Sequence, residues 1–317
     1  MPNRLGLKLK ALARKRSKNL GRIRELAAAW RDLARYDGPE ALQLLVEWTR
    51  ERLRFAGVDG AVFGCSGGVD SSLTACVLAR AAPGRVTGYL LPCESSAKDE
   101  VDARALLAAL QIECRRIDVG PALRAIEPLL SGTSKASNAR GNLKTRLRTM
   151  FLFHEAAARK ALFVGTGDLD EGFVGYYTKG SGADLAPIAS LHKSEVRTLL
   201  ELALAPIDRK LARRLSRKPA DAGLVPGMLA EKELGVSYSE IERSLDVILE
   251  TCALFEGGVV PREIDLFGEA LARSKVSSKA FSRVVELIYR ARHKASGPPI
   301  LWRRDTTRSG LDEFENE

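Results

Sequence analysis

Apolar and polar residues follow one another along this chain in blocks that are typical of alternating strands and helices. Short apolar runs, which predict strands, cover residues 61–65, 86–91, 117–119 and 161–166. Stretches with apolar residues at helical spacing predict helices at residues 39–57, from 71 onward, and at 99–110, 142–158, 239–254 and 278–293. Because strands that alternate with helices favour a parallel sheet with helices on both faces, the predicted fold class is α/β, with a doubly wound and mostly parallel sheet.

The chain divides into a basic N-terminal extension at residues 1–36, a folded domain at 37–300 and an irregular tail at 301–317. Asp37 and Pro39 mark the start of the domain, since they are typical of a helix cap and a first helical turn. Every charged residue before Glu25 is a lysine or an arginine. Such a run is most often a solvated helix face or tail, so no nucleic-acid partner is expected. Proline and glycine interrupt residues 209–232, which predicts a mobile loop.

The composition of the chain bears on whether it contacts membranes, forms disulfides or binds a metal through histidines. The 317 residues carry a formal net charge of +10, and 45% of them are hydrophobic. No apolar run approaches the ~20 residues that span a bilayer, so a cytoplasmic protein without membrane contact is expected. The five cysteines include no CxxC pair and are expected to be reduced thiols. Three histidines are too few to favour a histidine-rich metal centre.

The strongest chemical signal is a glycine- and serine-rich loop between a predicted strand and a predicted helix. It comprises Ser66, Gly67, Gly68, Val69, Asp70, Ser71 and Ser72. The glycines allow a tight turn that brings backbone N–H groups against an anion, and a helix N-terminus favours bound phosphate. Asp70 can hold Mg²⁺ against that phosphate. The loop lacks the lysine of the GxxxxGK[ST] motif, and a plain strand–helix turn is its alternative interpretation.

This loop resembles the pyrophosphate-binding loop of the N-type ATP pyrophosphatases. That superfamily includes NAD synthetases, GMP synthetases, asparagine synthetases and several tRNA-modifying enzymes. The resemblance implies the adenine nucleotide alpha hydrolase-like fold. It also implies that ATP is cleaved between its α and β phosphates, which gives an adenylated intermediate and pyrophosphate.

Further segments resemble NAD synthetases, in the same order along the chain. They are residues 92–103, 141–148, 165–171, 175–179, 182–187, 191–197, 233–241 and 293–299. The resemblance implies that deamido-NAD is adenylated on its nicotinate carboxylate and then amidated to NAD, and that the protein is a homodimer. Ammonia is the expected nitrogen donor, because the stretch before Pro39 has no room for an amidase domain.

Residues that follow the predicted strands supply the candidate chemistry. Glu171 comes after the strand at 161–166 and is expected to meet Asp70 at the carboxyl edge of the sheet, where open α/β sheets bind ligands. Two carboxylates there suit Mg²⁺ that bridges ATP phosphates, and Lys193 can neutralise developing charge. The candidate catalytic residues are therefore Asp70, Glu171 and Lys193, and the candidate metal ligands are Asp70 and Glu171. Thr166 and Lys193 join the loop as candidate ATP- and pyrophosphate-binding residues.

A second group of residues is implied by the resemblance to bind deamido-NAD. Its members are Arg146, Tyr176, Tyr177, Lys179, Asp184, His293 and Lys294. From the residues alone, Arg146 belongs to a basic helix face that can clamp a phosphate, and the tyrosines are equally compatible with a place in the core.

The part of the chain that receives the acid departs from the family pattern. Residues 179–184 are two residues shorter than the family's KYGDGGAD and lack its middle aspartate, and Ala230 stands where an aspartate is usual. An amide ligase that acts on a different carboxylate therefore stays open as an alternative. A tRNA-modifying ATP pyrophosphatase is a further alternative, although neither paired catalytic cysteines nor an added RNA module is evident.

Overall fold

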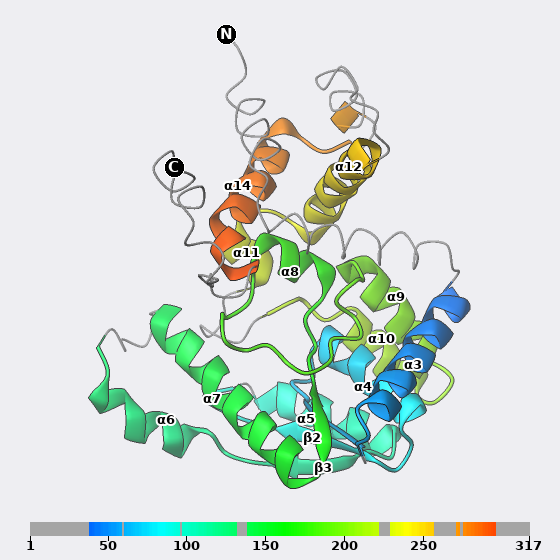
Figure 1. Ribbon diagram of the computed structural model, residues 1–317, viewed down its shortest axis with the longest axis vertical. Coiled ribbons are helices and arrows are strands. Elements are labelled where there is room, and N and C mark those ends of the chain that lie inside the picture. Colours follow the sequence, from blue (N-terminus) through cyan, green and yellow to red (C-terminus); the bar gives the residue numbers. More distant parts are fainter. Residues whose placement is uncertain are drawn as a thin grey trace, which may run out of the picture.

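A four-stranded parallel sheet, in the lower part of the view in Figure 1, has helices on both faces. The computed structural model describes residues 38–58, 60–95, 97–131, 138–221, 229–256, 271–272 and 275–295, so the basic extension at 1–36 and the tail at 301–317 lie outside the described residues. The strands are β1 (Gly60–Gly64), β2 (Val86–Leu90), β3 (Glu113–Arg116) and β4 (Ala161–Val164), in the order β3-β2-β1-β4. The prediction of a mostly parallel α/β sheet is confirmed.

The order of the strands creates a switch point next to β1. The chain winds from β1 outward through β2 to β3, and then returns to add β4 on the other side of β1. At such a point the connections leave the sheet in opposite directions, which opens a crevice at the carboxyl ends of the strands. The loop after β1 and the loop after β4 both lie there, and each carries predicted site residues.

Helices cover both faces of the sheet. Successive residues of a strand point to opposite faces, so a buried strand packs against a different group of helices on each face. On β1, Ala61 and Phe63 belong to one apolar core and Val62 to the other. The first core is shared with α3 (Gly38–Phe55), α4 (Val69–Ala81), α5 (Ala97–Ala109), α9 (Lys193–Leu204) and α10 (Arg209–Ser216). The second core is covered by α6 (Gly120–Ile126), which continues into the 3₁₀ turn η1 (Glu127–Leu129), and by α7 (Asn138–Ala158).

A separate layer of helices stands over the carboxyl end of the strands. It consists of α8 (Leu169–Val174), α11 (Ala230–Leu234), α12 (Tyr238–Glu256) and α14 (Ser278–Ala295), which pack around an apolar core of their own. In Figure 1, α12 and α14 rise above the sheet at the top of the molecule. Because α8 follows β4 after a short turn, this layer is anchored beside the predicted site.

Three sequence-based predictions need correction. The third strand was expected at 117–119 but lies at Glu113–Arg116, because this polar and exposed edge strand contains no apolar run. The prediction of a mobile loop over 209–232 is wrong for the described part, which contains α10 and α11, whereas residues 222–228 lie outside the described residues. α10 forms because Asp208 caps it and Leu211 and Leu215 are buried. α7 begins at Asn138, about one turn earlier than predicted.

Two further expectations can be compared with the structure. Within the described part of the chain, every helix is too short or too polar to cross a membrane. Of the cysteines whose side chains are described, Cys65, Cys76 and Cys93 are buried and Cys114 is exposed, and all are free thiols. Free thiols agree with the prediction of reduced cysteines, and the three buried ones pack as small apolar residues, whereas Cys114 on the exposed strand β3 does not.

Candidate active site

The glycine-rich loop leaves β1 and opens α4 at the carboxyl edge of the sheet. Gly67 has a φ of 73°, in the left-handed region that glycine adopts without strain. Gly68 is the N-cap of α4, and no described side chain caps the helix there. The hydroxyls of Ser71 and Ser72 donate to the Gly68 carbonyl and hold the turn. An α-helix N-terminus without a side-chain cap favours a bound phosphate.

A second turn at the same edge carries two more carboxylates. It joins β4 to α8, and the Asp168 side chain caps α8 by accepting the backbone N–H of Glu171 at 2.8 Å. The side chain of Asp168 is fully buried, whereas those of Asp70 and Glu171 are about one-fifth exposed. The cap fixes the first turn of α8, and Glu171 and Asp70 both reach the ammonium group of Lys193 beyond the carboxyl ends of β4 and β1.

The ammonium group of Lys193 lies among these carboxylates. Its Nζ is 2.8 Å from Asp70 Oδ1, 2.7 Å from Asp168 Oδ2 and 3.1 Å from Glu171 Oε1. Lys193 is the first residue of α9 and is only 1% exposed. Burial on its own lowers the pKa of a lysine, but Glu171, Asp70 and Asp168 outweigh burial and raise the pKa of Lys193. The buried lysine is therefore charged.

The same carboxylates form the candidate metal centre. One oxygen from each of Asp70, Asp168 and Glu171 lies within 4.8 Å of the other two. Burial and the neighbouring negative charges raise the pKa of both Asp168 and Glu171, even though Lys193 opposes that rise. Three carboxylates with one ammonium leave a surplus of negative charge, which a divalent cation would neutralise. Carboxylate oxygens are also the ligands that Mg²⁺ takes, so the donor set fits this ion.

A buried ion network supports Lys193 from behind. Asp170 accepts the backbone N–H of Lys193 at 2.8 Å, and its other oxygen lies 2.7 Å from His192 Nδ1. His192 Nε2 lies 3.3 Å from Asp246 on α12. Burial lowers the pKa of His192, but hydrogen bonds to Asp170 and Asp246 more than offset this and raise it to about 10. The charged imidazole ties α12 to the first turn of α9.

Tyr238, at the start of α12, covers the ammonium group from the side of the helical layer. Its ring centroid lies 4.9 Å from Lys193 Nζ, a distance at which an aromatic ring stabilises a cation. Among the described residues, the Tyr238 hydroxyl has no hydrogen-bond partner although it is buried. Burial, followed by the charge of Glu171, raises the pKa of this phenol, so Tyr238 is neutral.

Several residues implied to bind deamido-NAD meet where α7, the loop after α8 and the end of α14 come together. Arg146 Nε donates to the Lys179 carbonyl at 3.1 Å, and Lys179 Nζ donates to the His293 carbonyl at 3.0 Å. Lys294 Nζ donates to the Tyr177 carbonyl at 2.8 Å and lies 5.4 Å from the centroid of its ring. The group is cationic and suits the phosphates of a dinucleotide.

Two residues of the predicted acid-binding group make other contacts. The Tyr176 hydroxyl donates to Glu233 Oε2 on α11 at 2.8 Å. Asp184 Oδ2 accepts the backbone N–H of Phe163 at 2.9 Å, so this carboxylate extends the edge of β4. Thr166 lies half-buried in the turn between β4 and α8. The proline pair at 298–299 lies outside the described residues.

The structure brings Asp70, Glu171 and Lys193 together, but sequence reasoning missed their supporting residues. Asp168 lies in a segment where only Glu171 had been selected, and its place directly before a helix that follows a buried strand was an available cap signal. Tyr238 lies in the segment 233–241 that resembles the family, but it was not selected, because a tyrosine at the start of a helix is most often a core residue.

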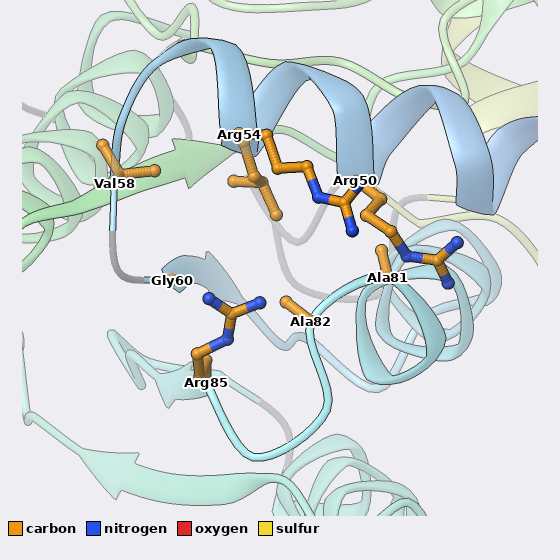
Figure 2. A pocket seen from close by; sticks show the side chains of 8 residues that line it. Arg50, Arg54, Val58, Gly60, Ala81, Ala82 and Arg85 are labelled. Atoms are coloured by element: carbon orange, nitrogen blue, oxygen red, sulfur yellow. The ribbon is translucent and has the colours of Figure 1, made fainter.

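A small cavity lies at the amino-terminal end of β1, opposite the carboxyl ends of the strands (Figure 2). Arg50, Arg54 and Arg85 line it beside Gly60, the first residue of β1. Its volume of about 30 Å³ has room for a water molecule and not for a nucleotide. The carboxyl edge is therefore the better candidate for the active site.

Comparisons with known proteins identify the family of the chain. The model of the NAD synthase family matches residues 41–298. The chain is 36% identical over 215 residues to an NH(3)-dependent NAD(+) synthetase from Syntrophomonas wolfei. The matched region makes up 65% of this chain and 84% of that protein. The chain is 35% identical over 271 residues to an NH(3)-dependent NAD(+) synthetase from Methanosarcina acetivorans, which covers 83% of this chain and 98% of that protein.

Solved structures resemble the whole described fold. The NMN synthetase from Francisella tularensis superposes with a TM-score of 0.69 and 28% identity, over 84% of this chain and 99% of that one. The NH3-dependent NAD synthetase from Campylobacter jejuni gives a TM-score of 0.64 and 22% identity, over 84% of this chain and 100% of that one. The second likeness shows the fold alone.

Proposed function

The chain belongs to the NAD synthase family and is a ligase of NAD biosynthesis, and we propose that it amidates deamido-NAD with ammonia. ATP is the co-substrate, and AMP and pyrophosphate are the further products. One observation carries the proposal. The α4 N-terminus, which has no side-chain cap, lies beside Lys193 and three carboxylates. The helix N-terminus and the lysine suit a polyphosphate, and the carboxylates suit the cation that accompanies it.

In the proposed first step, an oxygen of the nicotinate carboxylate attacks the α-phosphorus of ATP. A new oxygen–phosphorus bond forms while the bond from the α-phosphorus to the bridging oxygen breaks, and pyrophosphate leaves. The backbone N–H groups at the start of α4 and the ammonium of Lys193 stabilise the charge on this leaving group. Mg²⁺, which Asp70 and Glu171 would hold with Asp168 beside them, supplies further charge neutralisation when it is bound.

In the second step, ammonia attacks the acyl carbon of the adenylate. A carbon–nitrogen bond forms, the carbon–oxygen bond to AMP breaks, AMP leaves with the electron pair, and the nitrogen loses one proton to water. The first step is needed because a free carboxylate is a poor electrophile. The role of the protein is to hold the two reactants in line and to stabilise charge.

The acid substrate is assigned to the cationic group formed by Arg146, Lys179 and Lys294, with His293 and Tyr177 beside it. Tyr176 and Asp184 are proposed to complete this surface. What supports the assignment is the convergence of three segments that are far apart in the chain. Lys179 contacts both α7 and α14, through Arg146 and His293.

A second candidate substrate is the acid form of NMN, which lacks the adenylate half of the dinucleotide. The observation that favours it is the likeness to the NMN synthetase of Francisella tularensis, at 28% identity and a TM-score of 0.69. The shortened segment at 179–184 lies in the cationic group, where a smaller acid would need fewer contacts. Both reactions use the same adenylation chemistry.

The test supplies the purified protein with ATP, Mg²⁺ and ammonium, together with deamido-NAD or the acid form of NMN. Mass spectrometry then identifies the amide and the nucleotide products. We expect NAD, AMP and pyrophosphate from deamido-NAD. Faster amidation of the mononucleotide acid would move the assignment to NMN synthesis. Release of ADP and orthophosphate would contradict the adenylation mechanism altogether.

We further propose a homodimer that works in the cytoplasm, with residues 37–300 as its catalytic domain. Met150 and Phe153 on α7 are both exposed, at 54% and 41%, although they are large and apolar. Large apolar residues that lie exposed together on one helix of a single chain are typical of a surface that a partner subunit covers. Light scattering that reports a monomer at micromolar concentration would contradict the dimer, and Phe153→Glu should convert a true dimer into monomers.

A further inference from the structure

Lys218 joins the glycine-rich loop to the helix beside it. Its ammonium group donates to the carbonyl oxygen of Gly67 at 2.9 Å and to Asp102 Oδ2 at 2.9 Å, and lies 2.5 Å from Asp99 Oδ1. The side chain is 18% exposed, and Lys218 lies two residues after the end of α10 at Ser216. One cation therefore connects the segment after α10, the first half of α5 and the loop that precedes α4.

The acceptors of Lys218 are held firmly. Asp102 is almost fully buried and also accepts Arg214 Nε at 3.0 Å, so α10 is fixed to α5 at two points. The loop lies directly on α5, since a Cβ placed on Gly67 would come within 2.4 Å of the Asp99 carbonyl oxygen. The Gly67 carbonyl is thus the loop group that Lys218 holds against a rigid neighbour.

The direction of this carbonyl has a consequence for the next residue. The carbonyl of Gly67 and the N–H of Gly68 belong to one planar peptide unit, in which they point in opposite directions. When Lys218 holds the Gly67 carbonyl against α5, the Gly68 N–H must point away from α5. It points toward Ser66 Oγ, at 3.2 Å, on the side of the loop where α4 begins.

We propose that Lys218 is a positioning residue that orients the Gly67–Gly68 peptide for binding the pyrophosphate part of ATP. The inference rests on the proposed function and adds to it a residue that does not touch the nucleotide. Because a peptide between two glycine residues rotates easily, the tie from Lys218 to the Gly67 carbonyl adds to the serine hydrogen bonds within the loop in keeping one orientation. The tie also makes the phosphate site depend on α10.

The test compares Lys218→Met and Lys218→Gln with Lys210→Met, a variant of an exposed lysine on α10. Pyrophosphate with Mg²⁺ is titrated by calorimetry, which requires neither turnover nor the acid substrate. Loss of one charged hydrogen bond predicts an affinity about tenfold or more weaker in Lys218→Met. Lys218→Gln keeps a donor for Gly67 and should lose less, while Lys210→Met should match the wild type.

Two further readouts separate positioning from a purely structural tie. Hydrogen exchange of the backbone at 66–72 should be faster in Lys218→Met, and the Michaelis constant for ATP should rise more than that for the acid. If Lys218→Met does not fold, Lys218→Arg and Lys218→Gln carry the comparison. Unchanged pyrophosphate affinity in every folded Lys218 variant would overturn the inference. A wild type that binds no pyrophosphate would instead overturn the proposed function.

Discussion

Lys193 Nζ donates to Asp70 Oδ1 across 2.8 Å, although the two residues are 123 positions apart in the chain. Asp70 belongs to the helix after β1, and Lys193 begins α9. Asp168 and Glu171 share the same ammonium group from the turn after β4. The lysine therefore lies where all three carboxylates of the candidate metal centre converge.

Removal of one carboxylate tests the metal centre. Asp70→Asn and Glu171→Gln keep the shape of each side chain but remove a metal ligand, so turnover should fall about a hundredfold or more. Binding of Mn²⁺, measured by electron paramagnetic resonance, should weaken in parallel. Glu51→Gln, at an exposed position on α3, is the control. Near-normal turnover and Mn²⁺ affinity in either variant would remove that residue from the site.

Replacement of Lys193 tests the balance of charge. Lys193→Met leaves three carboxylates without their ammonium, and the loss of a buried ionic partner should lower the free energy of unfolding by roughly 3 kcal/mol or more in EDTA. Added Mg²⁺ can take over that neutralising role, so it should stabilise Lys193→Met more than the wild type. Urea unfolding with and without Mg²⁺ measures both effects, with Lys232→Met as the exposed control. Equal stabilisation of both proteins by Mg²⁺ would show that lysine and metal do not share the site.

The ion network behind Lys193 predicts a pH dependence. The pKa of His192 is raised to about 10 by Asp170 and Asp246 in the folded state, against about 6.5 for a free histidine. Its contribution to stability is therefore fully present below pH 6.5 and is lost as the pH rises through 10. The wild type should lose more stability than His192→Gln between pH 7 and 10, as measured by urea unfolding.

The same titration can be observed directly. The chain has three histidines, and the carbon-13 NMR signal that disappears in His192→Gln belongs to His192. This signal should show a protonated imidazole through neutral pH. A midpoint near 6.5 for that signal would mean that the hydrogen bonds to Asp170 and Asp246 do not hold the charged form.

The glycine-rich loop predicts different costs for its two glycines. Gly67→Ala puts a side chain at a φ of 73° and a Cβ 2.4 Å from a backbone oxygen of α5, so it should destabilise the protein by at least ~1–2 kcal/mol. Gly68 has a φ of −82°, and its Cβ would meet only the movable Ser66 hydroxyl at 3.2 Å. Gly68→Ala should therefore cost clearly less free energy of unfolding. Equal losses would contradict the described backbone conformation.

The contact between α8 and α14 predicts a selective effect on the acid substrate. A Cβ on Gly175 would lie 2.1 Å from Ala291 Cβ, so Gly175→Ala must displace α14 and with it Lys294. The Michaelis constant for the acid should rise about tenfold, and that for ATP should change less. Gly172→Ala, with nothing within 4 Å of its Cβ, should leave both unchanged. A larger effect on ATP would mean that α14 does not serve the acid.

Sequence patterns predicted the parts of this fold that depend on local physics. The apolar run of β1 and the glycine-rich loop after it were recognisable, because buried parallel strands are apolar and phosphate loops need glycine. The polar edge strand β3 was misplaced, since exposure on the edge removes the apolar signal. Asp170, His192 and Tyr238 were missed because their importance arises only when α8, α9 and α12 are packed together.

The strand order has a consequence for how the protein folds. β1 can pair with β2 early, because Ala61 and Val86 are close in the chain. The other edge of β1 can pair only after Ala161 has been synthesised and has reached Gly60. Distant parallel pairing of this kind is slow, because a long loop must close before any contact stabilises it. During that interval the apolar strand β1 has an unpaired edge, which is a template for pairing with other chains. The strand order that brings the loops after β1 and β4 together therefore also gives the unfinished chain a risk of aggregation.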